Sequence, residues 1–210
     1  MPVTPLTRKT AGAPPPSYLE RLRDWLGFVL VLWGVEIVDR FLFGQSLQNH
    51  GIHPRSLSHL EGLFFAPFLH TGWNHLTGNS LSLLLLGALI LATGWRDLLA
   101  VCLTAAAVGG ATVWFIGQTG TNHIGASTLV FGCLAFLLAS GFYRPAPGTI
   151  LVSVAILVFY GSAFAGVLPT DSVRAAGISW EGHLGGALGG LLVARHRRRK
   201  FASHSRPSAR

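Results

Sequence analysis

Charged side chains are scarce in this sequence. Of its 210 residues only 11% are Asp, Glu, Lys or Arg, whereas 50% are hydrophobic and 26 are glycine. Soluble domains usually carry about a quarter charged residues. This shortage excludes an ordinary soluble domain, and we predict an all-α polytopic membrane protein.

Cysteine is also rare, with two residues in the chain. Cys102 and Cys133 both fall inside apolar stretches, so we expect two buried thiols. Two cysteines placed in this way give neither a disulfide framework nor the spacing of metal ligands. The sequence indicates no metal and no cofactor.

The positive charge is concentrated near the two ends of the chain. The net charge is +8, and the clearest cluster, at 195–200, directly follows an apolar segment. The positive-inside rule and the attraction of anionic lipids for basic residues produce this pattern, whereas nucleic-acid binding explains it less well. We therefore expect the lipid bilayer, and no nucleic acid, as a partner.

Six apolar segments are candidates for membrane spans. They are residues 22–42, 75–94, 98–117, 127–141, 149–168 and 178–194. Six spans place both ends of the chain on one side, and the basic clusters predict that this side is cytoplasmic. The predicted organisation is a cytoplasmic, disordered tail, a six-span domain and a basic cytoplasmic tail, at residues 1–20, 21–194 and 195–210.

Three polar side chains are expected at a similar depth in the membrane. Ser127 lies fourteen residues before Gly141, where the fourth segment ends, which corresponds to ~21 Å of helix. The bilayer core is about 30 Å thick, so Ser127 should lie below the outer surface. The same measure places Asn79 and His183 near this level. Polar groups at such depth are costly and often mark a functional site.

Each of these polar groups also has a plain structural interpretation. Ser127 follows Gly125-Ala126 at the start of a helix, where unpaired N–H groups could stabilise an oxyanion, but a serine there is also a common N-cap. His183 has no acidic side chain to orient it, because Glu181 points to another face, and alone it could serve a proton relay.

A second pair of polar residues lies one helical turn apart. His75 and Asn79 share one helix face, and neutral hydrogen-bond donors suit an oxyanion hole. Alone they could equally join two helices by hydrogen bonds. Gly186 and Gly190 form a smooth stripe after His183, which would let a neighbouring helix approach closely.

Three motifs together resemble those of the rhomboid family of intramembrane serine proteases. His70, His75 and Asn79 match its H-x4-H-x3-N pattern, and Gly125-Ala126-Ser127-Thr128 is similar to its G-x-S-x motif. The segment from His183 to Gly190 is similar to its last helix, with H-x2-G-x3-G spacing. The motifs fall in the family's order, on the second, fourth and sixth predicted spans.

The resemblance implies a rhomboid-type six-helix bundle with a serine–histidine dyad. Ser127 would be the nucleophile and His183 the general base, while His75, Asn79 and the Ser127 backbone N–H would hold the oxyanion. His70 would brace the first loop. Phe131 stands where a tyrosine often stacks on the catalytic histidine, and can still stack without the hydroxyl.

The resemblance also implies substrates and a location. The substrates would be single-span membrane proteins, cleaved from an active site that opens to the outer or periplasmic side of a bacterial plasma membrane. An inactive rhomboid-like chaperone or adaptor is the main alternative, and a small transporter using the intramembrane histidines is another. We assign no function to the loop residues His50, His53 and His123, and the sequence does not indicate an oligomeric state.

Overall fold

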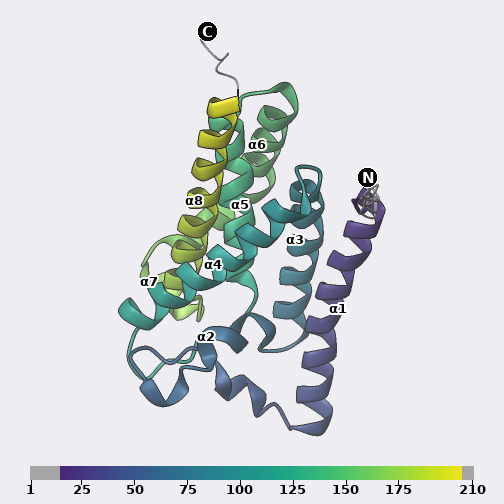
Figure 1. Cartoon of the computed structure of the whole chain (residues 1–210). Helices are drawn as coiled ribbons and strands as arrows, with labels where there is room; N and C mark the ends of the chain where they lie inside the picture. The colour runs from purple at the N-terminus through teal and green to yellow at the C-terminus, as the bar shows by residue number, and fades with distance from the viewer. Residues whose placement is uncertain (1–14, 205–210) are drawn as a thin grey trace, which may run out of the picture.

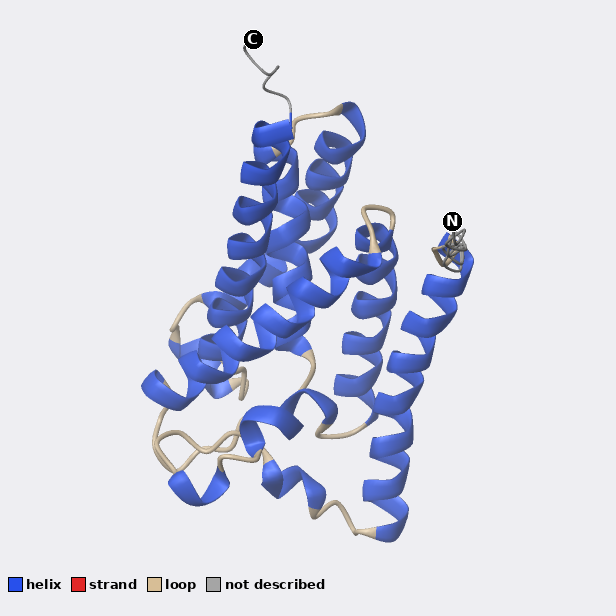
Figure 2. Cartoon of the chain, in the orientation of Figure 1, coloured by secondary structure: helices blue, strands red, loops and turns tan. Residues whose placement is uncertain are grey.

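The computed structural model describes residues 15–204, and all regular elements of this part of the chain are helical (Figures 1 and 2). The all-α prediction is confirmed for these residues. The predicted tails fall partly on residues 1–14 and 205–210, which lie outside the described residues. The long helices are α1 (Tyr18–Leu42), α3 (Trp73–Leu91), α4 (Trp95–Ile116), α5 (Ser127–Tyr143), α6 (Pro147–Tyr160) and α8 (Trp180–His204).

Each of the six predicted segments overlaps one of these helices. Within residues 15–204, three stretches are able to cross a bilayer by length and composition: α3, α4, and Pro147–Val167, which joins α6 to the 3₁₀ helix η4 (Gly161–Val167). Helix α5 is apolar but has only 17 residues. Apolar helices of membrane-spanning length are therefore present, and the count of six spans stays a prediction.

Two helix ends differ from the prediction. The fifth segment leaves α-helical geometry after Tyr160 and continues as the 3₁₀ turns of η4. Helix α8 continues for ten residues past Ala194. Its basic end contacts neighbouring helices: Arg197 forms an ion pair with Asp97 of α4. Arg198 lies over the Tyr143 ring of α5, 5.7 Å from its centroid. Residue 194 is thus the end of the apolar stretch and not of the helix.

Helix α8 packs against both α4 and α5 through glycine (Figure 1). A Cβ added to Gly186 would lie 2.2 Å from the carbonyl oxygen of Thr128, and one added to Gly190 would lie 1.9 Å from that of Gly132. Gly189 faces α4 in the same way. Backbone therefore packs directly on backbone, as the stripe of small residues predicted.

The long loop between α1 and α3 crosses one end of the bundle, opposite the start of α1 and the end of α8 (Figure 1). It contains α2 (Gly62–Phe65) and three 3₁₀ turns. Ile52 pairs with His123 in an isolated antiparallel bridge, and Arg55 donates to the carbonyl oxygens of Phe115 and Gly117 at 2.9 and 2.8 Å. The first loop is therefore tied to the end of α4 and to the loop that precedes α5.

Candidate active site

A cavity of about 790 Å³ lies between α3, α5, α8, the 117–126 loop and the segment around α7 (Asp171–Ala175). Ser127, His183, His75 and Asn79 all line it. Helix α3 supplies the last two, and α5 and α8 supply one each. The fold thus brings four side chains from three separate motifs to one cavity.

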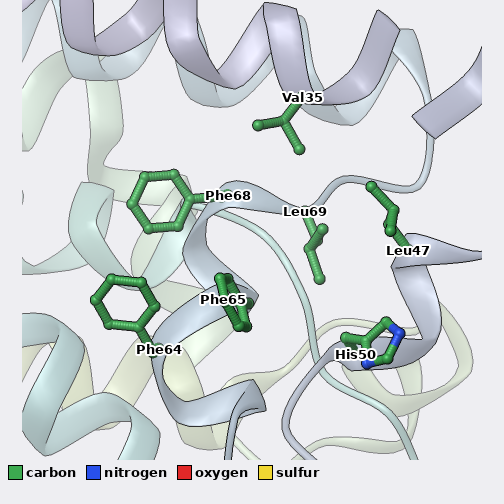
Figure 3. Close-up of a pocket in the computed structure, with 7 residues that line it drawn as sticks. All are labelled: Val35, Leu47, His50, Phe64, Phe65, Phe68 and Leu69. Carbon is green, nitrogen blue, oxygen red and sulfur yellow. The ribbon is translucent and has the colours of Figure 1, made fainter. Parts of the chain in front are cut away.

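A second cavity, of about 460 Å³, lies between α1 and the loop that follows it (Figure 3). Six of its seven lining residues are apolar, among them Phe64 and Phe68, and the seventh is His50. None of the seven is a serine, cysteine or carboxylate. The candidate nucleophile and base, Ser127 and His183, therefore line the first cavity and not the second.

Ser127 and His183 are in direct hydrogen-bond contact. Ser127 is the first residue of α5, His183 lies in the first turn of α8, and the Ser127 Oγ to His183 Nε2 distance is 2.9 Å. The other ring nitrogen, Nδ1, lies 3.1 Å from the carbonyl oxygen of Gly166. A carbonyl only accepts hydrogen bonds, so in the neutral ring Nδ1 donates to Gly166 and Nε2 accepts from the serine hydroxyl.

Two further contacts hold the His183 ring. Phe131, one turn after Ser127, stacks on it with ring centroids 4.0 Å apart and planes inclined by 15°. Gly166 approaches so closely that a Cβ there would lie 3.1 Å from Nδ1. A backbone carbonyl and an aromatic face therefore orient the imidazole, in the place where many serine hydrolases use a carboxylate.

Two polar side chains of α3 lie beside the turn that precedes Ser127. Gly125 has a φ of +118°, and its Cα faces the side chains of α3: an added Cβ would lie 2.7 Å from His75 Nε2 and 3.6 Å from Asn79 Nδ2. Asn79 is only 7% exposed, and its Nδ2 has no hydrogen-bond partner within the described residues. Buried amide groups normally have a partner. This nitrogen is a donor available to an atom in the cavity.

The backbone at the start of α5 adds another donor. Ser127 is the first helical residue, and no side chain caps this helix end in the described part of the chain. The first N–H groups of a helix have no partner within the helix and carry its positive dipole end. The Ser127 N–H therefore belongs to an electropositive edge beside the serine oxygen.

His70 lies behind this edge. Its ring is 1% exposed and meets the His75 ring edge to face, with centroids 5.2 Å apart. The Ala126 N–H donates to His70 Nε2 at 3.4 Å, and the Gly125 N–H donates to the Ala66 carbonyl at 2.8 Å. These bonds fix the turn that precedes Ser127.

Three groups at the site were not predicted from the sequence: the Gly166 carbonyl, His123 and Ser179. The Gly166 carbonyl has no sequence signal, because every residue has a carbonyl. His123 and Ser179 also line the cavity and are bonded to each other, with 2.7 Å between Nδ1 and Oγ. Burial lowers the pKa of the His123 imidazole, and the neighbouring His53 lowers that pKa further.

Fold and site together define an all-helical membrane protein with a half-buried serine–histidine pair. Residues 57–200 match the family model of the rhomboid domain. The chain therefore belongs to the rhomboid family.

Mycobacterial proteins are among its relatives. The uncharacterized protein Rv1337 of Mycobacterium tuberculosis is 37% identical over 198 residues, which cover 92% of this chain and 80% of the relative. The uncharacterized protein ML1171 of Mycobacterium leprae is 37% identical over 201 residues, covering 90% and 79%. The similarity thus extends over most of the length of both chains.

Proposed function

We propose that this protein is an intramembrane serine protease, which hydrolyses peptide bonds in or next to transmembrane segments. One observation carries the proposal: Ser127 Oγ lies 2.9 Å from His183 Nε2. Membership of the rhomboid family supports the same activity. The pair has the elements of nucleophilic catalysis, namely a hydroxyl, a base, and a third group that orients the base.

The proposed topology has six spans, formed by α1, α3, α4, α5, the α6–η4 segment and α8. Basic residues flank the start of α1 and the end of α8, so both termini are assigned to the cytoplasm. The first loop and the cavity then face the outer or periplasmic side of a bacterial plasma membrane. The proposed six-span domain occupies residues 21–194, and the end of α8 after residue 194 would extend into the cytoplasm.

The first half of the proposed reaction forms an acyl-enzyme. As Ser127 Oγ attacks the substrate carbonyl carbon, its proton moves to His183 Nε2 and the carbonyl electrons move onto oxygen. His75, Asn79 and the Ser127 N–H stabilise that oxyanion. When the C–N bond breaks, the amine leaves with the proton from His183, and the acyl group stays on Ser127.

Water completes the second half. It attacks the ester carbonyl, His183 takes its proton, and a second tetrahedral oxyanion forms at the same donors. Collapse of this intermediate breaks the bond to Ser127 Oγ, which recovers a proton from His183. The enzyme returns to its initial state, and the product leaves as a carboxylic acid, which releases its proton to water.

The proposed substrates are single-span membrane proteins. A helix engages its carbonyl groups in internal hydrogen bonds, so a scissile bond must be presented in an extended segment. We therefore expect cleavage where a substrate helix unwinds near the outer membrane interface.

Removing the buried amide is expected to lower turnover. Asn79→Ala deletes the unpaired Nδ2 donor, and loss of one oxyanion-hole donor typically costs about 100- to 1,000-fold in kcat. The effect should appear in kcat with KM nearly constant, measured on a fluorogenic transmembrane peptide in detergent. A matched control is Ser80→Ala on the same helix, because Ser80 accepts from Trp33 Nε1 and does not line the cavity. Equal kcat values for the two variants would contradict the oxyanion assignment.

Labelling with a fluorophosphonate tests the proposal directly. We expect wild type to be labelled at Ser127, and labelling to fall to background in His183→Ala, because the hydroxyl then loses its base. Peptide mass spectrometry identifies the modified residue. A rhomboid-like adaptor or a small transporter offers no activated hydroxyl, so a properly folded wild type that stays unlabelled would favour those functions.

A further inference from the structure

His123 lies in the loop between α4 and α5 and connects three parts of the molecule. Its backbone exchanges two hydrogen bonds with Ile52 of the first loop, at 2.9 and 3.0 Å. Its ring is held between Thr121 Oγ1 and Ser179 Oγ, each at 2.7 Å. It also lines the cavity that holds Ser127 and His183.

The donor and the acceptor in each hydrogen bond of the His123 ring can be assigned from the hydrogens that each group carries. The Thr121 hydroxyl donates its one hydrogen to the Gln118 carbonyl at 2.6 Å, so it accepts the bond from His123 Nε2. In the neutral imidazole Nδ1 then has no hydrogen, and the Ser179 hydroxyl donates to it. The polarity of the chain is fixed from Ser179 through His123 to Thr121.

Ser179 is the residue that directly precedes α8. Its carbonyl accepts the N–H of His183 at 3.0 Å, and thereby begins the helical turn that carries the imidazole. Its hydroxyl lies against the same turn, because a Cβ added to Gly182 would be 3.0 Å from both Ser179 Oγ and Thr128 Oγ1. A displacement of Ser179 is therefore transmitted to His183 and to the first turn of α5.

We propose that His123 is a positioning residue for His183, which holds the first turn of α8 in register with Ser127 through its bond to Ser179. The proposal rests on the proposed protease function. It assigns His123 no contact with the substrate or with the reacting atoms. The bridge to Ile52 makes the first loop part of the same connection.

Two substitutions, His123→Asn and His123→Gln, distinguish a positioning role through Ser179 from a role in holding the 117–126 loop alone. The Asn amide can occupy the place of the ring Nδ1, whereas the Gln amide reaches the place of Nε2. We expect His123→Asn to keep the bond to Ser179 and most of kcat. We expect His123→Gln to keep only the bond to Thr121 and to lose about tenfold or more in kcat, with KM unchanged, because small displacements of catalytic groups are costly. Thermal unfolding in detergent shows that both variants are folded.

Ser179 supplies the second half of the test. Ser179→Ala should lower kcat as much as His123→Gln does, whereas Ser179→Thr, which keeps the hydroxyl, should have nearly the wild-type kcat. The double variant His123→Gln/Ser179→Ala should have a kcat no lower than that of either single variant. Equal kcat values for His123→Asn and His123→Gln, or additive losses in the double variant, would overturn the proposal. Failure of the protease function itself gives a different result, namely no Ser127-dependent cleavage by wild type. In that case the His123–Ser179 coupling is measured by the same double-mutant cycle on thermal unfolding, where additivity again overturns it.

Discussion

Replacing His183 by alanine is expected to abolish nearly all cleavage, and Ser127→Ala should do the same. In the proposed reaction the two side chains act as one unit, since Ser127 Oγ gives its proton to the His183 Nε2 to which it is hydrogen-bonded. Removing one member of such a unit typically costs as much as removing all of it, about 10⁴- to 10⁶-fold in kcat. The double variant should therefore retain the same residual rate as each single variant.

Single-turnover cleavage of a transmembrane peptide in detergent measures this prediction. His196→Ala is the matched control, because His196 lies on the same helix and is exposed. It should retain the wild-type rate. Losses that multiply in the double variant would contradict a shared catalytic role for Ser127 and His183.

Gly190→Ala is expected to be the most damaging methyl group that can be added to the helix pair α5–α8. The new Cβ would lie 1.9 Å from the Gly132 carbonyl oxygen, which is backbone and cannot rotate away. The helices must separate, which costs roughly 1–3 kcal/mol or more. Because the same packing sets the 2.9 Å contact between Ser127 and His183, we expect kcat to fall together with stability.

Thermal unfolding in mild detergent, with kcat measured well below the transition, checks this expectation. Gly34→Ala is the control, since nothing lies within 4 Å of the added methyl group and alanine favours a helix interior. It should match wild type or unfold at a slightly higher temperature. A Gly190→Ala variant with wild-type stability and rate would show that α5 and α8 do not need this close contact.

The parts of the fold that sequence predicts well are those set by local composition. Apolar stretches between charged or proline-containing turns predicted segments that overlap all six long helices. The glycine stripe predicted close packing after His183, and Gly186 and Gly190 do contact the backbone of α5. Ser127, His183, His75 and Asn79 could be predicted because each belongs to a sequence motif, and all four line one cavity.

The features that could not be predicted from the sequence depend on backbone geometry or on contacts between residues far apart in the chain. The Gly166 carbonyl reaches His183 because residues 161–167 adopt 3₁₀ geometry, and no side chain signals that choice. The bond between His123 and Ser179 joins residues 56 positions apart in the sequence. The extended end of α8 is paired through Arg197 with Asp97 of α4, a residue 100 positions earlier in the sequence. Contacts of this kind are decided by tertiary packing.

The most direct test of the central claim is cleavage of a single-span reporter in reconstituted liposomes by wild type and by Ser127→Ala, with the products mapped by mass spectrometry. We predict that wild type cuts the reporter in or next to its transmembrane segment and that Ser127→Ala does not. Cleavage that survives in Ser127→Ala, or that falls only in a soluble domain of the reporter, would contradict it.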